Sequence, residues 1–112
     1  EAKGPLDAAA LASLRLLGDG TVPKDIVAVY LEDSPRRLGE LKRSIESNDQ
    51  KTAVRAAHTL KGSCRTMGGK ALGDLIEAME RLLREGDFPA AHAALGPVEA
   101  EYARVLAALE KL

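Results

Sequence analysis

Several residue types that would support particular chemistries are scarce in this chain. Among its 112 residues there is no tryptophan, one phenylalanine and a single cysteine, Cys64. One cysteine excludes an internal disulfide and a zinc site built from several thiolates, and this usage fits a reducing compartment. The formal net charge of −1 gives no overall attraction to nucleic acid or to a membrane surface. No apolar run approaches the ~18 residues of a membrane span, and the start lacks the pattern of a secretory signal, so we expect a cytoplasmic protein.

The spacing of the apolar residues predicts helices throughout. Apolar residues recur three and four positions apart, and no segment shows the alternation that a half-buried strand needs. A length of 112 residues suits a single domain over 1–112. We expect a short helix over about 5–17 and four longer helices over about 22–112, separated near Asp49, Gly69 and Asp87. The predicted fold is all-α, an up-and-down antiparallel four-helix bundle with the short N-terminal helix covering one end.

Two prolines fall inside the predicted long helices. The apolar stripes stay in phase across Pro35 and Pro97, although proline usually ends or bends a helix. We therefore predict kinks at these two positions rather than breaks.

One histidine is predicted to lie on the solvent side of the helix that begins near residue 50. The inward stripe of that helix consists of Ala53, Ala57, Leu60, Cys64 and Met67. At about 100° per residue, His58 falls about 140° away from this stripe. The residues predicted to surround it are Lys51, Arg55, Lys61, Gly62, Arg65 and Gly69. After Asp49 the helix places no carboxylate on this face, so we expect a cationic strip around an exposed ring.

The neighbours of His58 favour a nucleophilic ring. Nearby positive charges disfavour a second charge on the imidazole, so we expect the neutral form, which can attack phosphorus. Lys61, together with Arg55 or Arg65, could screen the negative charge that a phosphoryl group would bring. Gly62 lies one turn from His58 and costs roughly 1 kcal/mol relative to alanine inside a helix. Access to the ring is one explanation for this glycine, and an accidental or packing glycine is the other; a merely solvated histidine is the alternative for the whole site.

The remaining candidate side chains have weaker signals. His92 follows an inward alanine on the last helix, so we expect it at the surface, and Cys64 is expected in the core. The two histidines fall on different helices, and no spacing of Cys, His or carboxylates predicts a metal site. No Gly-rich phosphate loop is present, so we expect no ATP site. Glu80 lies at the edge of an apolar stripe, within reach of the histidine helix.

The segment His58-Thr59-Leu60-Lys61-Gly62-Ser63, followed by Gly68 and by the apolar stripe from Leu72 to Leu83, resembles the histidine phosphotransfer (HPt) domain family of bacterial two-component phosphorelays. The resemblance covers roughly Pro23 to Leu112. It implies a four-helix bundle whose exposed His58 accepts a phosphoryl group from a receiver aspartyl phosphate and passes it to another receiver aspartate. It further implies that Lys61 helps to hold the phosphoryl group, Gly62 gives access, Ser63 supports the local geometry and Gly68 shapes the end of the helix.

The resemblance also implies how such a domain works with partners. It would be a phosphocarrier whose active site is completed by a receiver domain, with Mg²⁺ on the receiver and no cofactor of its own. Response-regulator receiver domains and a hybrid sensor histidine kinase are the expected partners of a monomeric domain that contacts neither nucleic acid nor membrane. The domain would be either free-standing or the cytoplasmic module of a larger, membrane-anchored kinase.

Other functions remain open on the sequence. The phosphoacceptor domain of a chemotaxis-type kinase is built on a related histidine bundle. A non-catalytic helical adaptor that binds receiver domains would leave His58 without a chemical role. A sensor-kinase dimerisation domain is disfavoured, because its motif places an acid directly after the histidine, where this chain has Thr59.

Overall fold

The computed structural model describes residues 5–16 and 20–112 and has five α-helices in that part of the chain. These are α1 (Ala8–Arg15), α2 (Lys24–Glu46), α3 (Gln50–Thr66), α4 (Lys70–Arg84) and α5 (Phe88–Glu110). The prediction of one short and four long helices is confirmed. α1 begins after the predicted residue 5 because Asp7 caps it, accepting a hydrogen bond from the N–H of Ala10 at 3.2 Å. Its predicted end at residue 17 lies outside the described residues.

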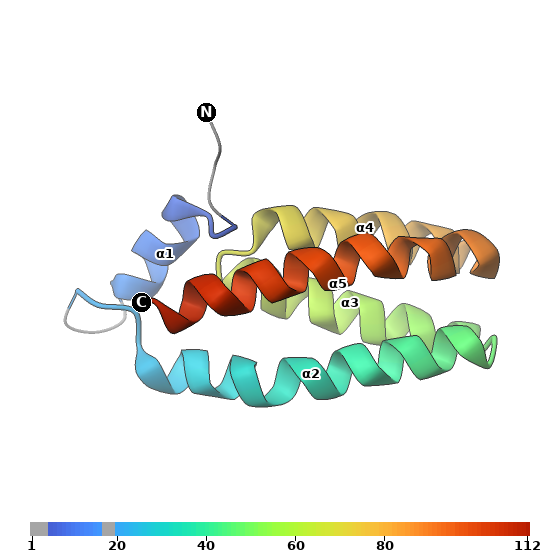
Figure 1. Ribbon diagram of the computed structural model, residues 1–112, viewed down its shortest axis with the longest axis horizontal. Coiled ribbons are helices and arrows are strands. Elements are labelled where there is room, and N and C mark those ends of the chain that lie inside the picture. Colours follow the sequence, from blue (N-terminus) through green and yellow to red (C-terminus); the bar gives the residue numbers. More distant parts are fainter. Residues whose placement is uncertain (1–4, 17–19) are drawn as a thin grey trace.

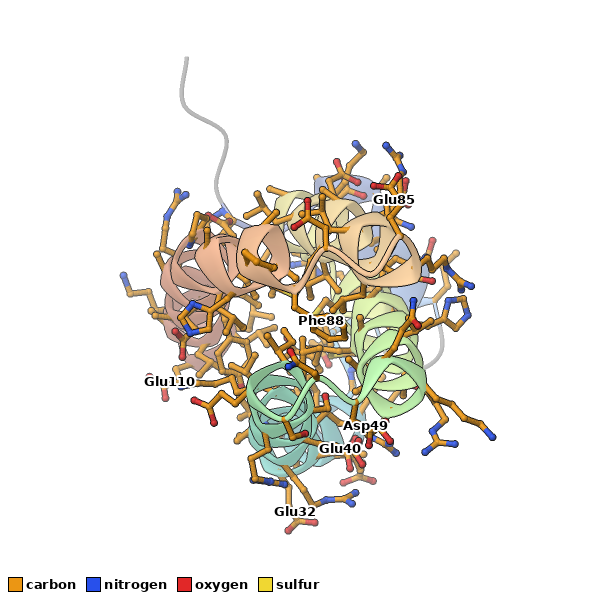
Figure 2. The ribbon with its side chains drawn as sticks, turned by 90° about the vertical axis from the view of Figure 1, so that its right-hand side faces the viewer. Glu32, Glu40, Asp49, Glu85, Phe88 and Glu110 are labelled. Atoms are coloured by element: carbon orange, nitrogen blue, oxygen red, sulfur yellow. The ribbon has the colours of Figure 1, made fainter. Side chains whose placement is uncertain are left out.

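The four long helices run antiparallel to their chain neighbours around one core (Figure 1). α3 packs against α2 and α4, and α5 packs against α4 and α2, so the four helices form a closed bundle when seen along its axis (Figure 2). The all-α bundle predicted from the apolar spacing is confirmed. None of the helices in the described ranges has both the length and the apolar character that crossing a bilayer requires.

The short helix α1 covers the end of the bundle at which α3 turns into α4 (Figure 1). The N–H of Asp7 donates a hydrogen bond to the carbonyl of Gly68, and Leu11 and Leu14 are buried. Gly68 has a φ of +87°, a left-handed conformation that glycine adopts without steric cost. The turn that ends α3 therefore also provides the attachment point for α1.

Capping side chains mark the start of α3 and of α5, and the two prolines inside helices mark no boundary. Asp49 caps α3 by accepting from the N–H of Thr52 at 3.2 Å, and Asp87 caps α5 by accepting from the N–H of Ala90 at 3.1 Å. Pro35 and Pro97 both lie inside continuous helices and are exposed. Neither proline breaks its helix, as the in-phase stripes indicated.

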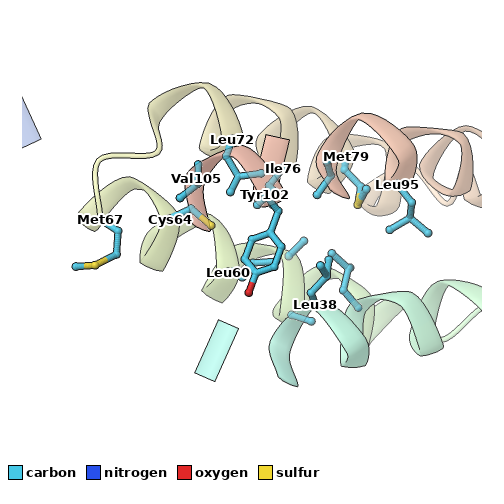
Figure 3. Close-up of a cluster of buried hydrophobic side chains, with 14 of the residues drawn as sticks. Leu38, Leu60, Cys64, Met67, Leu72, Ile76, Met79, Leu95, Tyr102 and Val105 are labelled. Carbon is cyan, nitrogen blue, oxygen red and sulfur yellow. The ribbon is translucent and has the colours of Figure 1, made fainter. Parts of the chain in front are cut away.

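The core is apolar except for two buried polar pairs, Ser34 with Tyr102 and Tyr30 with Cys64. The predicted inward stripe of α3 is buried, with Leu60, Cys64 and Met67 at most 2% exposed, and it faces Leu72, Ile76 and Val105 from α4 and α5 (Figure 3). The hydroxyls of Ser34 and Tyr102 lie 2.7 Å apart, which joins α2 to α5. Because both hydroxyls are buried, each depends on this partner.

The single cysteine belongs to this core. Cys64 is fully buried, and its Sγ lies 3.2 Å from the hydroxyl of Tyr30. Burial raises the pKa of the Cys64 thiol to about 11, and the hydrogen bond with Tyr30 only partly opposes that effect. The thiol is therefore protonated at neutral pH and packs as a small apolar side chain.

Ser34→Ala should lower the free energy of unfolding by about 1–2 kcal/mol, because it leaves the buried hydroxyl of Tyr102 without its partner. The double variant Ser34→Ala/Tyr102→Phe should recover part of that loss, since no hydroxyl then remains unpaired. Urea unfolding of the wild type, both single variants and the double variant measures the coupling. Strictly additive losses would show that the two hydroxyls are independent.

Candidate functional site

His58 lies near the middle of α3 with its ring in solvent. Its side chain is 64% exposed, and the neighbouring Lys51, Arg55 and Gly62 are exposed on the same face. Gly69 does not share this face, contrary to the helical-wheel prediction. α3 ends at Thr66, so the chain has already turned at Gly68, and Gly69 is buried beneath the turn.

A carboxylate from α4 lies directly beneath His58. The Glu80 side chain is only 6% exposed, and its Oε2 lies 3.3 Å from Nδ1 of His58. Oε2 also accepts from the guanidinium of Arg84 at 2.6 Å, and Oε1 lies 2.9 Å from the ammonium of Lys61. The predicted reach of Glu80 to the histidine helix is confirmed.

The expectation of a purely cationic strip is therefore wrong. It considered α3 alone, and α4 contributes three carboxylates to the same surface. Lys61 is mostly buried against Glu80, with 16% of its side chain exposed. Arg65 crosses α4 to reach Asp74 at 2.9 Å and Glu77 at 2.8 Å. The side chains of Lys61 and Arg65 therefore extend towards α4 and not over the exposed side of the His58 ring.

The charge state of Glu80 determines the tautomer of His58. Burial alone would raise the pKa of the Glu80 carboxyl, but the contacts with Lys61 and Arg84, assisted by His58, hold that pKa below its ordinary value. Glu80 is therefore ionised at neutral pH and can only accept hydrogen bonds. Nδ1 of a neutral His58 ring must then carry the proton and donate it towards Oε2, which leaves the lone pair on Nε2.

Gly62 faces open space one turn from His58. A Cβ atom built at Gly62 would meet nothing within 4 Å, so packing does not explain this glycine. Ser63 donates its hydroxyl to the carbonyl of Thr59 in its own helix at 3.2 Å, on the α2 side of α3. The open space excludes a packing role for Gly62 and agrees with access beside the ring, and an accidental glycine would have the same surroundings.

Another glycine of the region has the opposite environment. A Cβ atom at Gly73 on α4 would lie 2.6 Å from Cγ of Arg65, so this glycine makes the space through which Arg65 crosses the helix. No sequence pattern pointed directly to this arrangement, although a glycine inside a strongly periodic helix is itself unusual. Arg84 was also not singled out, despite lying four residues after Glu80, a spacing that pairs side chains on a helix.

The described residues offer no metal site, since no three His, Cys, Asp or Glu side chains gather there. His92 is exposed on α5. It lines a shallow hollow at the end of the bundle where α2 ends and α5 begins. The exposed His58 ring, which faces Glu80 through Nδ1, is placed for nucleophilic attack through Nε2.

Gly62→Ala should raise the free energy of unfolding by about 0.5–1 kcal/mol, because alanine restricts the unfolded backbone and meets no obstacle in the fold. Gly73→Ala is the matched control, also inside a helix, and should gain nothing because its Cβ would displace Arg65. Urea unfolding of both variants measures the difference. A loss of stability in Gly62→Ala would indicate a structural requirement at that position.

Glu80→Gln should destabilise the protein by roughly 1–3 kcal/mol at neutral pH, because the mostly buried Lys61 loses its counter-charge. A carboxyl whose pKa falls on folding stabilises the fold above its unfolded pKa, near the ordinary value of 4.5, and this contribution is lost as the pH falls through the folded-state pKa. The difference from wild type should therefore be constant above about pH 5.5 and shrink on acidification. Urea unfolding across this pH range measures it.

Glu77→Gln is the control for this pH series, one turn earlier on α4 with exposed arginine partners. It should cost less than about 1 kcal/mol, since exposed ion pairs contribute little. Equal losses in the two variants would argue against a special role for the buried carboxylate.

Comparison with known proteins agrees with this geometry. The family model described as "Hpt domain" matches residues 25–110, which span α2 to α5. The crystal structure of histidine-containing phosphotransfer protein B (HptB) from Pseudomonas aeruginosa PAO1 superimposes with a TM-score of 0.89 at 26% identity, over 98% of this chain and 95% of that chain. A search of curated protein sequences gives no match.

The family match covers most of the chain, and the structural match covers nearly all of it. Proteins of this family interact with receiver domains and kinases in phosphorelays. The chain belongs to the Hpt domain family, and its function is histidine phosphotransfer in a phosphorelay.

Proposed function

We propose that His58 is the phosphoacceptor, taking a phosphoryl group from the aspartyl phosphate of one receiver domain and passing it to an aspartate of another. The observation that carries the proposal is the exposed ring whose Nδ1 faces the buried Glu80 carboxylate at 3.3 Å. This contact orients the imidazole and directs the Nε2 lone pair away from the carboxylate, to the side from which a partner can approach. The other histidine of the chain, His92, has no such contact among the described residues.

The transfer exchanges one bond for another at phosphorus. Nε2 of His58 forms the N–P bond while the acyl phosphate P–O bond breaks, and the receiver carboxylate departs with that electron pair. The ring keeps its proton on Nδ1 and gains positive charge as the bond forms. The ionised Glu80 carboxylate stabilises this charge, because it lies beside that N–H before the reaction begins. Return transfer reverses each change.

The cations near His58 would act on the phosphoryl group. Lys61 is the proposed phosphoryl-stabilising residue, because its ammonium lies 2.9 Å from the Glu80 carboxylate, which is next to the His58 ring. Gly62 provides the space for a partner's active site, while Ser63 and Gly68 support the local helix geometry. Arg55 is exposed near His58, and Arg65 would have to leave Asp74 and Glu77 to contribute charge.

The receiver would supply the rest of the active site. Its aspartate and its Mg²⁺ complete a loose, in-line transition state, and this chain contributes a positioned imidazole and nearby charge. The domain is then a phosphocarrier that uses no ATP and binds no cofactor itself. The proposal includes a monomeric domain acting in the cytoplasm, with response regulators and a hybrid sensor histidine kinase as partners.

His58→Gln should abolish phosphoryl transfer from a phosphorylated receiver domain, because glutamine has no nucleophilic nitrogen. Incubation with labelled receivers from the source organism, followed by acid and base treatment, should show an acid-labile, base-stable label on the wild type. His92→Gln, which removes the other histidine, should label like the wild type.

Absence of label on the wild type from every receiver tested would contradict the proposal and favour an adaptor that binds receivers without chemistry. Label that persists in His58→Gln and disappears in His92→Gln would move the phosphoacceptor to α5.

A further inference from the structure

A hollow opens beside His58, towards the N-terminal end of α3. Its volume is about 450 Å³. It is lined by Lys51, Val54, Arg55, His58, Thr59 and Arg84. Three of these side chains are cationic and none is a carboxylate, while Val54 is half-buried and supplies an apolar part of the surface. The hollow therefore combines positive charge with an apolar contact at the edge of the reactive ring.

Two of the three cations are not neutralised within the domain. The cations further along α3, Lys61 and Arg65, are paired with carboxylates of α4. Within the described part of the chain, Lys51 and Arg55 make neither an ion pair nor a hydrogen bond through their side chains. Asp49, the acid at the start of α3, caps the helix at Thr52 and attracts both cations electrostatically, but it forms an ion pair with neither. Positive charge is thus concentrated and available on this side of His58.

The surface on the other side of His58 has a different character. Along α3 the next exposed residues are Gly62 and Thr66, which are uncharged. A second hollow of about 260 Å³ between α2 and α3 is lined by Ile26, Val29, Tyr30, Asp33, Ser34, Ser63, Thr66 and Met67, without a cation. Among the described residues of α3 beside His58, the cations without an ion pair therefore lie towards the N-terminal end of the helix.

We propose that the hollow beside His58 receives carboxylate side chains of the receiver domain, and so sets the orientation in which the receiver docks. This inference rests on the proposed function of His58. A receiver active site must be acidic, because it holds the phosphoacceptor aspartate and because Mg²⁺ is bound through carboxylates. An acidic rim around that site is complementary to Lys51 and Arg55 when the receiver aspartate lies over His58.

The proposal assigns Lys51 and Arg55 to docking. Arg55, one turn from His58, also supports the phosphoryl group in the proposed function, whereas Lys51 has no role in the chemical step. Charges at an exposed interface mainly change the association rate and its salt dependence, whereas charges on the reacting group change the rate within the complex. Arg84 lines the hollow too, but it is bound to Glu80 at 2.6 Å and adds charge without being free to move. Lys51 is therefore the residue that separates docking from chemistry.

The test compares the charge-reversal variant Lys51→Glu/Arg55→Glu with a matched control, Arg43→Glu/Lys111→Glu. The control alters two other exposed cations that make no ion pair in the described structure, by the same change in net charge. The test variant should fold, because both positions are exposed and an acid in the first turn of a helix is favourable. Circular dichroism and thermal unfolding of both variants check this.

The probe is the receiver domain of the source organism that binds the wild type most tightly, with Mg²⁺ present. Two quantities are measured at ~50 mM and ~1 M salt: the Kd of the receiver, and the single-turnover transfer rate at saturating receiver. In the test variant the Kd should rise by at least about tenfold at low salt, and the difference should largely vanish at high salt. The saturated transfer rate is compared in the single variant Lys51→Glu, where it should stay within about twofold of wild type, and the control should match wild type in both quantities.

An unchanged Kd with a lower saturated rate would overturn the proposal, because the cations would then act on the phosphoryl group. Equal Kd increases in the test and control variants would also overturn it, since only net charge would matter. Failure of the proposed function gives a different result: no transfer from any receiver to the wild type. The binding comparison still decides the docking proposal in that case, because the Kd is measured without transfer.

Discussion

The buried carboxylate of Glu80 is the interaction on which the rest of the site depends. An ionised group with 6% of its side chain exposed is costly unless cations compensate it, and Lys61 and Arg84 do so from α3 and α4. The same carboxylate faces Nδ1 of His58 and so determines which ring nitrogen is free. The same carboxylate therefore compensates the cations of two helices and orients the His58 ring, so a change at Glu80 alters both.

The placement of the site on rigid elements follows from the same contacts. His58 lies in the interior of α3, and the carboxylate that orients it lies in the interior of α4, so neither side chain depends on a loop. About two turns further along α3, Arg65 passes over Gly73 to reach two more α4 carboxylates. These contacts tie the two helices together on the surface beside the ring, while the apolar core holds them together from within.

The sequence was sufficient for the fold and for the phase of the histidine helix. A regular stripe from Ala53 to Met67 defines the buried side of α3, and the exposure of His58 follows by rotation. It was insufficient for the electrostatics, because periodicity describes one helix at a time. The partners of Lys61 and Arg65 come from α4, between 9 and 19 residues away in the chain, and only the packing angle of the two helices brings them together. Gly69 was misplaced for a related reason: a helical wheel continues past the residue at which the helix ends.

A single exposed ring has a consequence for the flow of signal through a relay. On the proposed function, the donor and acceptor receivers must cover the same face of α3, so they exclude each other. The domain can therefore serve only one receiver at a time, and its throughput is limited by how quickly the first receiver leaves. Two receivers that compete for His58 also become coupled through occupancy alone, since an abundant acceptor delays reloading from the donor even when it accepts no phosphoryl group.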